Sequence, residues 1–332
     1  MNTFPVTYST LSAKALQTFI EQQYGFPNLS CKYLLRGVSD TYVLKNETGK
    51  YILKIYRDAH RSPEEIKGEA ELITTLENNG IHVAGLLKDT TGNKIQTFNA
   101  PEGTRYGMLF AFAKGKTDNN LTDNQVSVLG REMAAMHNVT SAIELTYKRP
   151  PYNWETLIYG PLRVLQPLFT EYDMVEEFEY LSETAHTLQQ RLQQLDCDAF
   201  STGYCHYDFF PKNFFFDEAD NITIFDFDFA GKGWLANDLS SFHVHLFYHM
   251  IQGFISREEV DKILADLVTH YRSVRPFSDN EVRAIPALGF LLLLFYLRFQ
   301  YENFDDWSNL FFGPRFVKHR IAEMRKYEAA FC

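Results

Sequence analysis

The chain has 332 residues, of which 45% are hydrophobic and 22% charged, so it has the balance of a globular protein and enough length for two cores. Its 42 acidic and 32 basic residues leave a formal net charge of −10 without a Lys/Arg-rich run, so we expect no nucleic-acid partner. Four scattered cysteines without a C-x-x-C pair exclude a disulfide framework and a cysteine zinc site, and they indicate a reducing, cytoplasmic setting.

The first third of the chain is predicted to be rich in strands. Apolar residues recur on one side of a helix that we expect over 10–24. Ser62 followed by Pro63 and two acidic residues predicts the start of a second helix, and Gly80 predicts its end. Short apolar and β-branched runs predict six strands: 31–35, 41–45, 51–56, 82–87, 94–98 and 106–112.

Helical periodicity dominates after Gly115. Four helices are expected, over 123–137, 176–195, 257–271 and 280–300, with a β-rich island over 204–229. We therefore predict an α+β fold with two lobes, a β-rich lobe of residues 1–113 and a larger, mainly helical lobe of residues 114–332. The apolar run 284–297 has 14 residues, fewer than the ~20 of a membrane span, so we expect a core helix and no membrane partner.

A loop and the hairpin after it carry the residues with chemical potential. His206, Asp208 and Asn213 lie in the loop, and Asp226 follows the second strand of the predicted hairpin 214–225. Paired strands return the chain to its start, so these four side chains should converge. Phosphoryl transfer needs a carboxylate to orient a hydroxyl, together with oxygen ligands for Mg²⁺. Asp208 suits the first task, and Asn213 with Asp226 suits the second.

An ordinary alternative is that these residues only form turns, as Asp and Asn often do. Asp226, however, stands between Phe225 and Phe227 behind an apolar strand. A carboxylate in such company is costly unless a cation compensates it.

The segment resembles the catalytic loop and metal-binding strand of the aminoglycoside phosphotransferase and choline kinase-like family, which is related to protein kinases. That family's loop typically reads His-Gly-Asp-Leu-His-x-x-Asn and is followed by an Ile-Asp-Phe run. Here Tyr207 replaces the glycine and Phe210 the second histidine, and the run reads Phe-Asp-Phe-Asp from 225 to 228. The later Trp-x-x-x-Asp-Leu pattern appears at 234–239, where Asp238 is expected to brace the loop.

The resemblance implies a two-lobed protein kinase-like fold and transfer of the γ-phosphate of ATP, with Mg²⁺, to a hydroxyl group of a small molecule. It gives Asp208 the role of catalytic base and makes His206 a catalytic-loop residue that shapes the loop rather than carrying the proton. The acceptors it implies are aminoglycosides, choline or ethanolamine, and homoserine-like compounds. Two alternatives remain, a protein Ser/Thr kinase of the stress-response type and a nucleotide-binding regulatory pseudokinase.

The resemblance also implies a nucleotide site in the first lobe. Lys54 on the third strand would contact the α- and β-phosphates and pair with a glutamate of the next helix; otherwise it is a solubilising lysine on an edge strand. Glu69 aligns best among the four acids of that helix, which are Glu64, Glu65, Glu69 and Glu71. The turn 37–41 has one glycine where protein kinases have three, and its N–H groups and the Ser39 hydroxyl are expected to touch phosphates.

The segment 109–115 matches the connection between lobes in that family. Backbone groups of Ala111 and Ala113 are expected to hydrogen-bond adenine there. The acceptor site is expected within 150–168 and 242–306, where aromatic and acidic residues would suit an amine: Trp154, Tyr301, Asp305, Asp306 and Trp307. Four histidines of the second lobe are expected to be structural, although the last three form an alternative metal cluster: His137, His243, His245 and His249.

Overall fold

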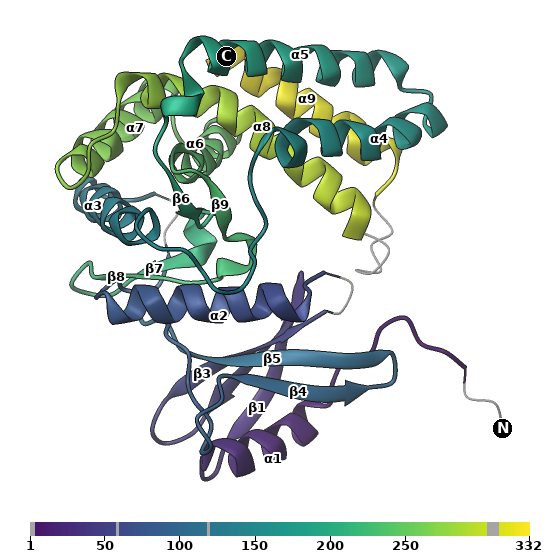
Figure 1. The fold of residues 1–332 in the computed structure, drawn as a ribbon, viewed down its shortest axis with the longest axis vertical. Coiled ribbons are helices and arrows are strands. Elements are labelled where there is room, and N and C mark those ends of the chain that lie inside the picture. The colour runs from purple at the N-terminus through teal and green to yellow at the C-terminus, as the bar shows by residue number, and fades with distance from the viewer. Residues whose placement is uncertain (1–3, 58–59, 118–119, 304–311) are drawn as a thin grey trace. The chain divides into compact units, whose positions relative to one another are not determined.

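The computed structural model describes residues 4–57, 60–117, 120–303 and 312–332. These residues form two compact units, which Figure 1 shows with their elements labelled. The first unit holds residues 4–114 together with Leu145–Arg149, and the second holds 115–144, 150–303 and 312–332. Leu145–Arg149 is therefore part of the first unit, although the residues before and after it in the sequence belong to the second unit.

The first unit is built on an antiparallel sheet of five strands in the order β1-β2-β3-β5-β4. The strands are β1 (Ser30–Arg36), β2 (Ser39–Lys45), β3 (Lys50–Tyr56), β4 (Ile95–Ala100) and β5 (Gly103–Ala111), and the helices are α1 (Ala13–Tyr24) and α2 (Pro63–Asn78). Leu53 and Ile55 of β3 share a core with the apolar side of α1. Lys54 points to the opposite face because side chains alternate along a strand, and there it meets α2.

Five of the six predicted strands are confirmed, and the predicted strand over 82–87 is wrong. The N–H of Ile81 still bonds to the Leu76 carbonyl at the end of α2, and the N–H of Val83 turns back to the Ile81 carbonyl. Only a single bridge, between Leu86 and Phe110, then joins this segment to β5. Residues 81–83 are thus still engaged in the turn that ends α2, and too few residues remain before Leu87 to form a full strand.

The second unit is mainly helical and carries two small hairpin-like sheets (Figure 1). Its helices are α3 (Asp123–Thr140), α4 (Gly160–Glu171), α5 (Val175–Gln194), α6 (Ala236–Ile251), α7 (Arg257–Arg272), α8 (Asp279–Asn303) and α9 (Pro314–Phe331), with a π-helical turn at Glu155–Tyr159. Its strands pair as β6 (Thr202–Cys205) with β9 (Gly231–Trp234) and as β7 (Phe214–Phe216) with β8 (Ile222–Ile224). The four predicted helices are confirmed as α3, α5, α7 and α8, whereas α4, α6 and α9 lie outside the four predicted ranges.

Helix α8 is the segment that was compared with a membrane span. Its 25 residues reach a mean hydropathy of 1.7 over their most apolar window, which is enough by composition to cross a bilayer. However, 67% of that window is buried inside the structure, as in the core helix of a globular unit.

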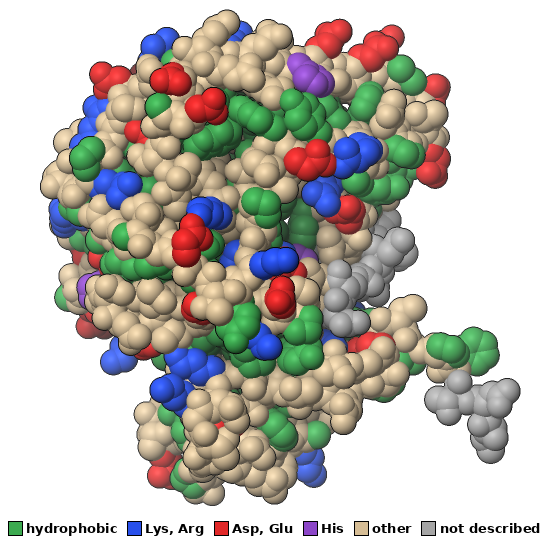
Figure 2. Space-filling model, viewed as in Figure 1, with side chains coloured by type: hydrophobic (Ala, Val, Ile, Leu, Met, Phe, Trp, Pro, Cys, Tyr) green, Lys and Arg blue, Asp and Glu red, His purple; other side chains and the backbone are tan. Residues whose placement is uncertain are grey.

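On the face shown in Figure 2, acidic and basic side chains lie interspersed, so that this face is neither uniformly acidic nor uniformly basic.

Candidate active site

The carboxylate of Asp208 is held by three side chains. It lies in the loop after β6 and is 3% exposed. Its Oδ2 accepts a hydrogen bond of 2.7 Å from the Asn213 amide and lies 3.0 Å from the Lys212 ammonium. Its Oδ1 accepts a hydrogen bond of 2.6 Å from the hydroxyl of Tyr296 on α8. The structure therefore brings Asn213 to Asp208, as the sequence predicted, and adds a tyrosine that the sequence did not indicate.

His206 connects this loop to the end of β8 and is 1% exposed. Its Nδ1 accepts a bond from the N–H of Asp208 at 3.3 Å, which assigns the ring proton to Nε2. Nε2 then donates to the carbonyl of Phe225 at 2.9 Å. Both ring nitrogens are engaged by backbone groups, an arrangement that suits a residue shaping the loop better than one carrying a proton.

Asp238 braces the loop from the first turn of α6, as expected. Its Oδ2 accepts from the N–H of His206 at 2.9 Å and its Oδ1 from the N–H of Tyr207 at 2.7 Å. His137 on α3 bonds to Asp238 through Nε2 at 2.9 Å and to the hydroxyl of Tyr271 through Nδ1 at 2.8 Å. All of these partners are buried, so His137 has the structural role predicted for it.

Tyr207 occupies the place of the family's glycine and has a left-handed backbone, with φ of 67°. Such a conformation costs a residue with a Cβ roughly 1–2 kcal/mol. The ring is almost fully buried and stacks on Tyr152 with 3.5 Å between ring centroids, while Phe295 meets it edge-on at 5.3 Å. Burial raises the pKa of Tyr207 well above its ordinary value, so the ring is a neutral part of the core.

Asn213 and Asp226 carry the oxygen atoms suited to a divalent cation. The Asn213 amide nitrogen donates both to the Asp208 carboxylate and to its carbonyl, so the amide oxygen is the atom left for a ligand. Asp226 follows β8 and is half-buried, and the preceding N–H, of Phe225, donates to the Asn213 carbonyl at 2.9 Å. The acid and the amide thus come from the same end of the β7–β8 hairpin.

The negative charges of Asp208 and Asp226 both act on the Lys212 ammonium group. Desolvation by nearby protein groups lowers the pKa of Lys212, although 65% of its side chain is exposed, but the charges of Asp208 and Asp226 outweigh that effect and raise the pKa above its ordinary value. Within the described ranges, no three His, Cys, Asp or Glu side chains are grouped to hold a metal. A Mg²⁺ ion would therefore need the Asn213 oxygen and the oxygens of bound phosphates besides the carboxylates, as is usual for this ion.

The alternative metal cluster on α6 is not supported. His243 Nδ1 bonds to the hydroxyl of Tyr327 at 2.7 Å, and burial lowers the pKa of His243 to about 3. His245 and His249 pack with their ring centroids 4.5 Å apart and are both buried. Together these three histidines behave as core residues, which is the ordinary interpretation given above.

Lys54 and Glu69 form an ion pair in the first unit. Lys54 Nζ lies 3.7 Å from Glu69 Oε1, and the Tyr56 hydroxyl donates to the same oxygen at 2.9 Å. Arg149, from the segment Leu145–Arg149, lies 3.7 Å from Glu69 Oε2. Because β3 runs between β2 and β5, the alternative that Lys54 stands on an edge strand is wrong.

Two other acids of α2 are engaged elsewhere. Glu65 completes a capping box with Ser62 at the start of the helix. Glu71 accepts bonds from the N–H groups of Thr146 and Tyr147. Glu69 is therefore the acid that the structure pairs with Lys54, and Arg149 is the partner that sequence reasoning missed.

The turn before β2 holds Ser39, which is 3% exposed. The Gly37 N–H donates to the Ser39 carbonyl at 3.0 Å, which closes the turn. The Ser39 hydroxyl is buried and meets no hydrogen-bonding partner among the described residues. A buried hydroxyl of this kind is usually satisfied by water or a ligand, and a phosphate oxygen fits it chemically.

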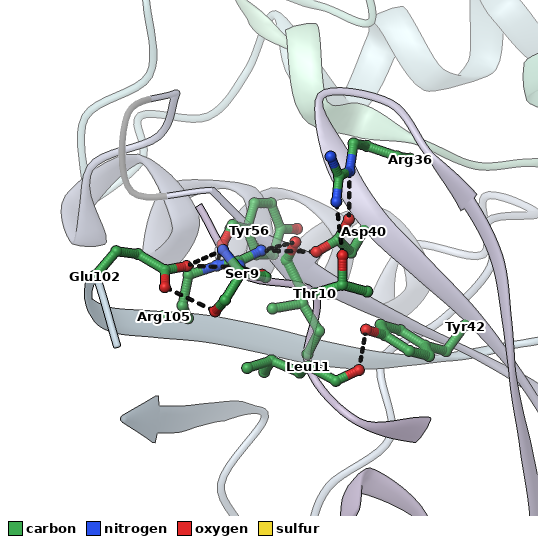
Figure 3. A network of polar contacts seen from close by, with 10 residues as sticks. Ser9, Thr10, Leu11, Arg36, Asp40, Tyr42, Tyr56, Glu102 and Arg105 are labelled. Carbon is green, nitrogen blue, oxygen red and sulfur yellow. Dashed lines mark hydrogen bonds and ion pairs between the residues drawn. The ribbon is translucent and has the colours of Figure 1, made fainter. Parts of the chain in front are cut away.

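A network of buried charges anchors this turn (Figure 3). Asp40, directly after Ser39, pairs with Arg105 at 3.2 Å and with Arg36 at 3.7 Å. Arg105 also donates to the carbonyl of Ser9, whose hydroxyl donates in turn to Glu102. The segment before α1 is thereby tied to the strand that begins at the turn.

The predicted adenine contacts lie at the end of β5. The N–H of Ala111 donates to the Gly85 carbonyl at 2.9 Å, so its carbonyl is the group left to accept from an adenine amine. Ala113 is half-buried just beyond the strand. Ser39, Lys54 and Glu69 belong to the same unit as these alanines.

Of the residues expected at the acceptor site, Asp305, Asp306 and Trp307 lie outside the described residues. Trp154 packs edge-on against Trp234 with centroids 4.9 Å apart, and Tyr301 packs against Phe312 at 5.7 Å. Nearer to Asp208, the ring of Tyr296 is surrounded by Phe210, Phe229 and Phe295. The surroundings of the carboxylate are therefore aromatic.

Known proteins share this sequence and architecture. The model of the phosphotransferase enzyme family matches residues 30–277. An amicoumacin kinase of Bacillus subtilis (strain 168) is 25% identical over 257 residues, which cover 75% of this chain and 72% of the relative. A homoserine kinase of Paramagnetospirillum magneticum is 26% identical over 293 residues, covering 85% and 83%.

A solved structure has the same fold. It is an amicoumacin kinase in complex with AMP-PNP, Ca²⁺ and Ami, and it is 21% identical in sequence. The superposition has a TM-score of 0.73 and covers 96% of this chain and 94% of the other. The predicted two-lobed, protein kinase-like α+β fold is thus confirmed.

Proposed function

The chain belongs to the phosphotransferase enzyme family, and we propose that it moves the γ-phosphoryl group of ATP to a hydroxyl group of a small molecule with Asp208 as catalytic base. The observation that carries this assignment is the buried Asp208 carboxylate, fixed 2.7 Å from the amide of Asn213 in a loop braced by Asp238. A carboxylate held in this way can accept a hydrogen bond from an acceptor hydroxyl without moving.

In the transfer, the acceptor hydroxyl donates its hydrogen bond to Asp208. The bond between acceptor oxygen and γ-phosphorus forms while the bond from that phosphorus to the bridging oxygen of ADP breaks, and the hydroxyl proton passes to Asp208. Lys212 keeps 65% of its side chain exposed and lies beside the carboxylate, where its charge favours anionic groups. Mg²⁺, held by the Asn213 amide oxygen and Asp226, would neutralise charge on the phosphate oxygens.

The nucleotide contacts are assigned to the first unit. Lys54, oriented by Glu69, would contact the α- and β-phosphates. The Ser39 hydroxyl, which meets no partner among the described residues, would donate one bond to a phosphate oxygen. The carbonyl of Ala111 and the N–H of Ala113 would bond to the adenine edge. These roles follow the family pattern, and the buried Lys54–Glu69 pair is the feature that supports them best.

The acceptor is a small molecule with a hydroxyl group, and we assign it to the amino-alcohol, amino-acid or aminoglycoside classes. The named relatives phosphorylate amicoumacin and homoserine, according to their names, and neither is a protein kinase. A pseudokinase is not favoured either, because Asp208, Asn213 and Lys54 are all present and engaged. ATP supply and the four free cysteines suit a cytoplasmic setting.

The test is a screen for ADP release. The protein is incubated with ATP and Mg²⁺ and, separately, with homoserine, choline, ethanolamine, amicoumacin, several aminoglycosides and a general protein substrate. We expect ADP release that depends on one class of small molecule and falls about 10²- to 10⁴-fold in Asp208→Asn. Transfer to the protein substrate alone would establish a protein kinase. Tight ATP binding without turnover on any acceptor would establish a pseudokinase.

A further inference from the structure

Tyr296 is a polar group of the active site to which the assignments above give no task. It lies on α8, 88 residues away from Asp208 in the sequence, and its hydroxyl donates to Asp208 Oδ1 at 2.6 Å. This is the shortest hydrogen bond recorded for the carboxylate among the described residues. Burial, followed by the charge of Asp208, raises the pKa of Tyr296 well above its ordinary value, so the phenol keeps its proton and remains a donor.

The three donors are distributed unequally over the two oxygens of the Asp208 carboxylate. An ionised carboxylate has about four lone-pair positions, two on each oxygen. Oδ2 serves both Asn213 and Lys212, whereas Oδ1 serves only Tyr296 among the described residues. Oδ1 is therefore the oxygen with a position left to receive a proton, and that position lies beside the Tyr296 hydroxyl.

We propose that Tyr296 is a positioning residue for phosphoryl transfer, which holds Asp208 Oδ1 so that its remaining lone pair meets the acceptor hydroxyl. The proposal rests on the proposed role of Asp208 as base. Asn213 and Lys212 both contact Oδ2 of the carboxylate. The hydrogen bond from Tyr296 to Oδ1 therefore stops the carboxyl group from rotating about its bond to Cβ. Two anchored oxygens fix the plane of the group.

The ring of Tyr296 is held independently of its hydroxyl. Phe229 meets it edge-on with centroids 5.9 Å apart, and Phe295 and Phe210 lie at 5.8 Å and 6.2 Å. A phenylalanine at position 296 keeps these contacts, since they involve only the ring. Tyr296→Phe therefore removes the hydrogen bond to the carboxylate, together with a longer contact of 3.5 Å to the Tyr207 carbonyl, and leaves the packing of α8 intact.

The acceptor must approach Oδ1 alongside these rings. Tyr296 contacts the carboxylate and Phe210 packs against Tyr296, and both side chains are half-buried and so also reach solvent. Loss of the hydroxyl should therefore affect the chemical step and the acceptor, but it should not affect the nucleotide. That division separates a positioning role from a general loss of structure.

The experiment is steady-state kinetics of Tyr296→Phe with the acceptor that the screen identifies. A hydrogen bond to a charged group contributes about 1.5–3 kcal/mol, so we expect kcat to fall about 10- to 100-fold. The KM for ATP and the thermal unfolding midpoint should stay at the wild-type values. Tyr180→Phe is the matched control, because its hydroxyl also donates to a carboxylate, that of Glu328, and its ring packs against α8.

A double-mutant cycle decides whether Tyr296 acts through Asp208. In the Asp208→Asn background, Tyr296→Phe should have no further effect on kcat, since the base that it positions is gone. Wild-type kcat in Tyr296→Phe would overturn the proposal, and so would a second full decrease in the Asp208→Asn background. A raised KM for ATP with unchanged kcat would do the same. If the wild-type protein turned over no acceptor, the role of Asp208 itself would fail, a result distinct from any of these.

Discussion

Asp208→Asn is the substitution that tests the assigned mechanism with least disturbance to the fold. Asparagine can turn its amide oxygen toward Asn213 and Lys212 and its NH₂ group toward Tyr296. The phenol hydroxyl is both donor and acceptor, so it can rotate and accept that bond. Each present partner of the side chain is thereby kept. What disappears is the negative charge and the capacity to take up the hydroxyl proton.

The magnitude of the effect can be stated for each quantity. A positioned general base contributes about 10²- to 10⁴-fold to the rate, which corresponds to roughly 2.7–5.4 kcal/mol of transition-state stabilisation. The ion pair with Lys212 is lost, but that side chain is 65% exposed, so the free energy of unfolding should change by less than about 1 kcal/mol. ATP affinity should stay within about twofold, because Asp208 makes none of the contacts assigned to the nucleotide or to Mg²⁺.

The assay combines acceptor-dependent ADP release, calorimetric titration with Mg²⁺-ATP, and urea unfolding. Asp261→Asn is a matched control, because it makes the same chemical change at an exposed residue of α7, where the carboxylate pairs with Arg257. Wild-type turnover in Asp208→Asn would remove this residue from its role as base. A large loss of stability, together with loss of ATP binding, would instead show that the carboxylate is structural.

Three further substitutions test other parts of the molecule. Asp226→Ala should weaken Mg²⁺-ATP binding at least tenfold by calorimetry, and unchanged affinity would mean that the metal is held elsewhere. Glu69→Ala leaves the buried Lys54 and Arg149 without their shared anion, so urea unfolding should show a loss of about 3–5 kcal/mol and the KM for ATP should rise. Glu69→Gln removes the charge but keeps the size of the side chain. A smaller loss of unfolding free energy in Glu69→Ala than in Glu69→Gln would contradict that reasoning. The pKa of His243 is about 3 in the folded chain and 6.5 when unperturbed, so the unfolded chain binds the extra proton between these values. The free energy of unfolding should therefore fall as pH drops below 6.5, by up to about 1.4 kcal/mol per unit, and His243→Gln should flatten that slope.

Local sequence patterns were sufficient for much of the fold and for the core of the site. Asn213 lies five residues after Asp208, and a single 3₁₀ turn at Pro211–Asn213 brings the two side chains together. The hairpin that follows returns the chain to the same place, as strand pairing requires. Lys54 was found in the same way, because an apolar strand with one lysine is unusual and needs a buried anion. Short-range geometry fixes each of these arrangements.

Contacts between distant segments were beyond the reach of those patterns. Tyr296 stands in a long apolar helix, where nothing local separates a tyrosine that meets a carboxylate from one that fills the core. Arg149 reaches Glu69 because Leu145–Arg149 packs with the first unit, although it follows residue 113. The strand predicted over 82–87 fails for a related reason, because its backbone bonds to the end of α2 are invisible in its own composition.

Two departures from the family's loop pattern, at positions 207 and 210, are compensated by aromatic residues elsewhere in the second unit. At position 207, the strain of a left-handed tyrosine is roughly 1–2 kcal/mol, whereas a large buried side chain contributes about 1.5–3 kcal/mol in transfer from water alone. Burial of the ring against Tyr152 is thus of the size needed to offset the strain, and the N–H of Tyr207 still reaches Asp238 at 2.7 Å. At position 210, phenylalanine removes a polar group beside the loop, but the hydroxyl of Tyr296, whose ring lies 6.2 Å away, supplies one directly on Asp208. Because the geometry of the carboxylate is retained in both cases, neither departure argues against phosphoryl transfer.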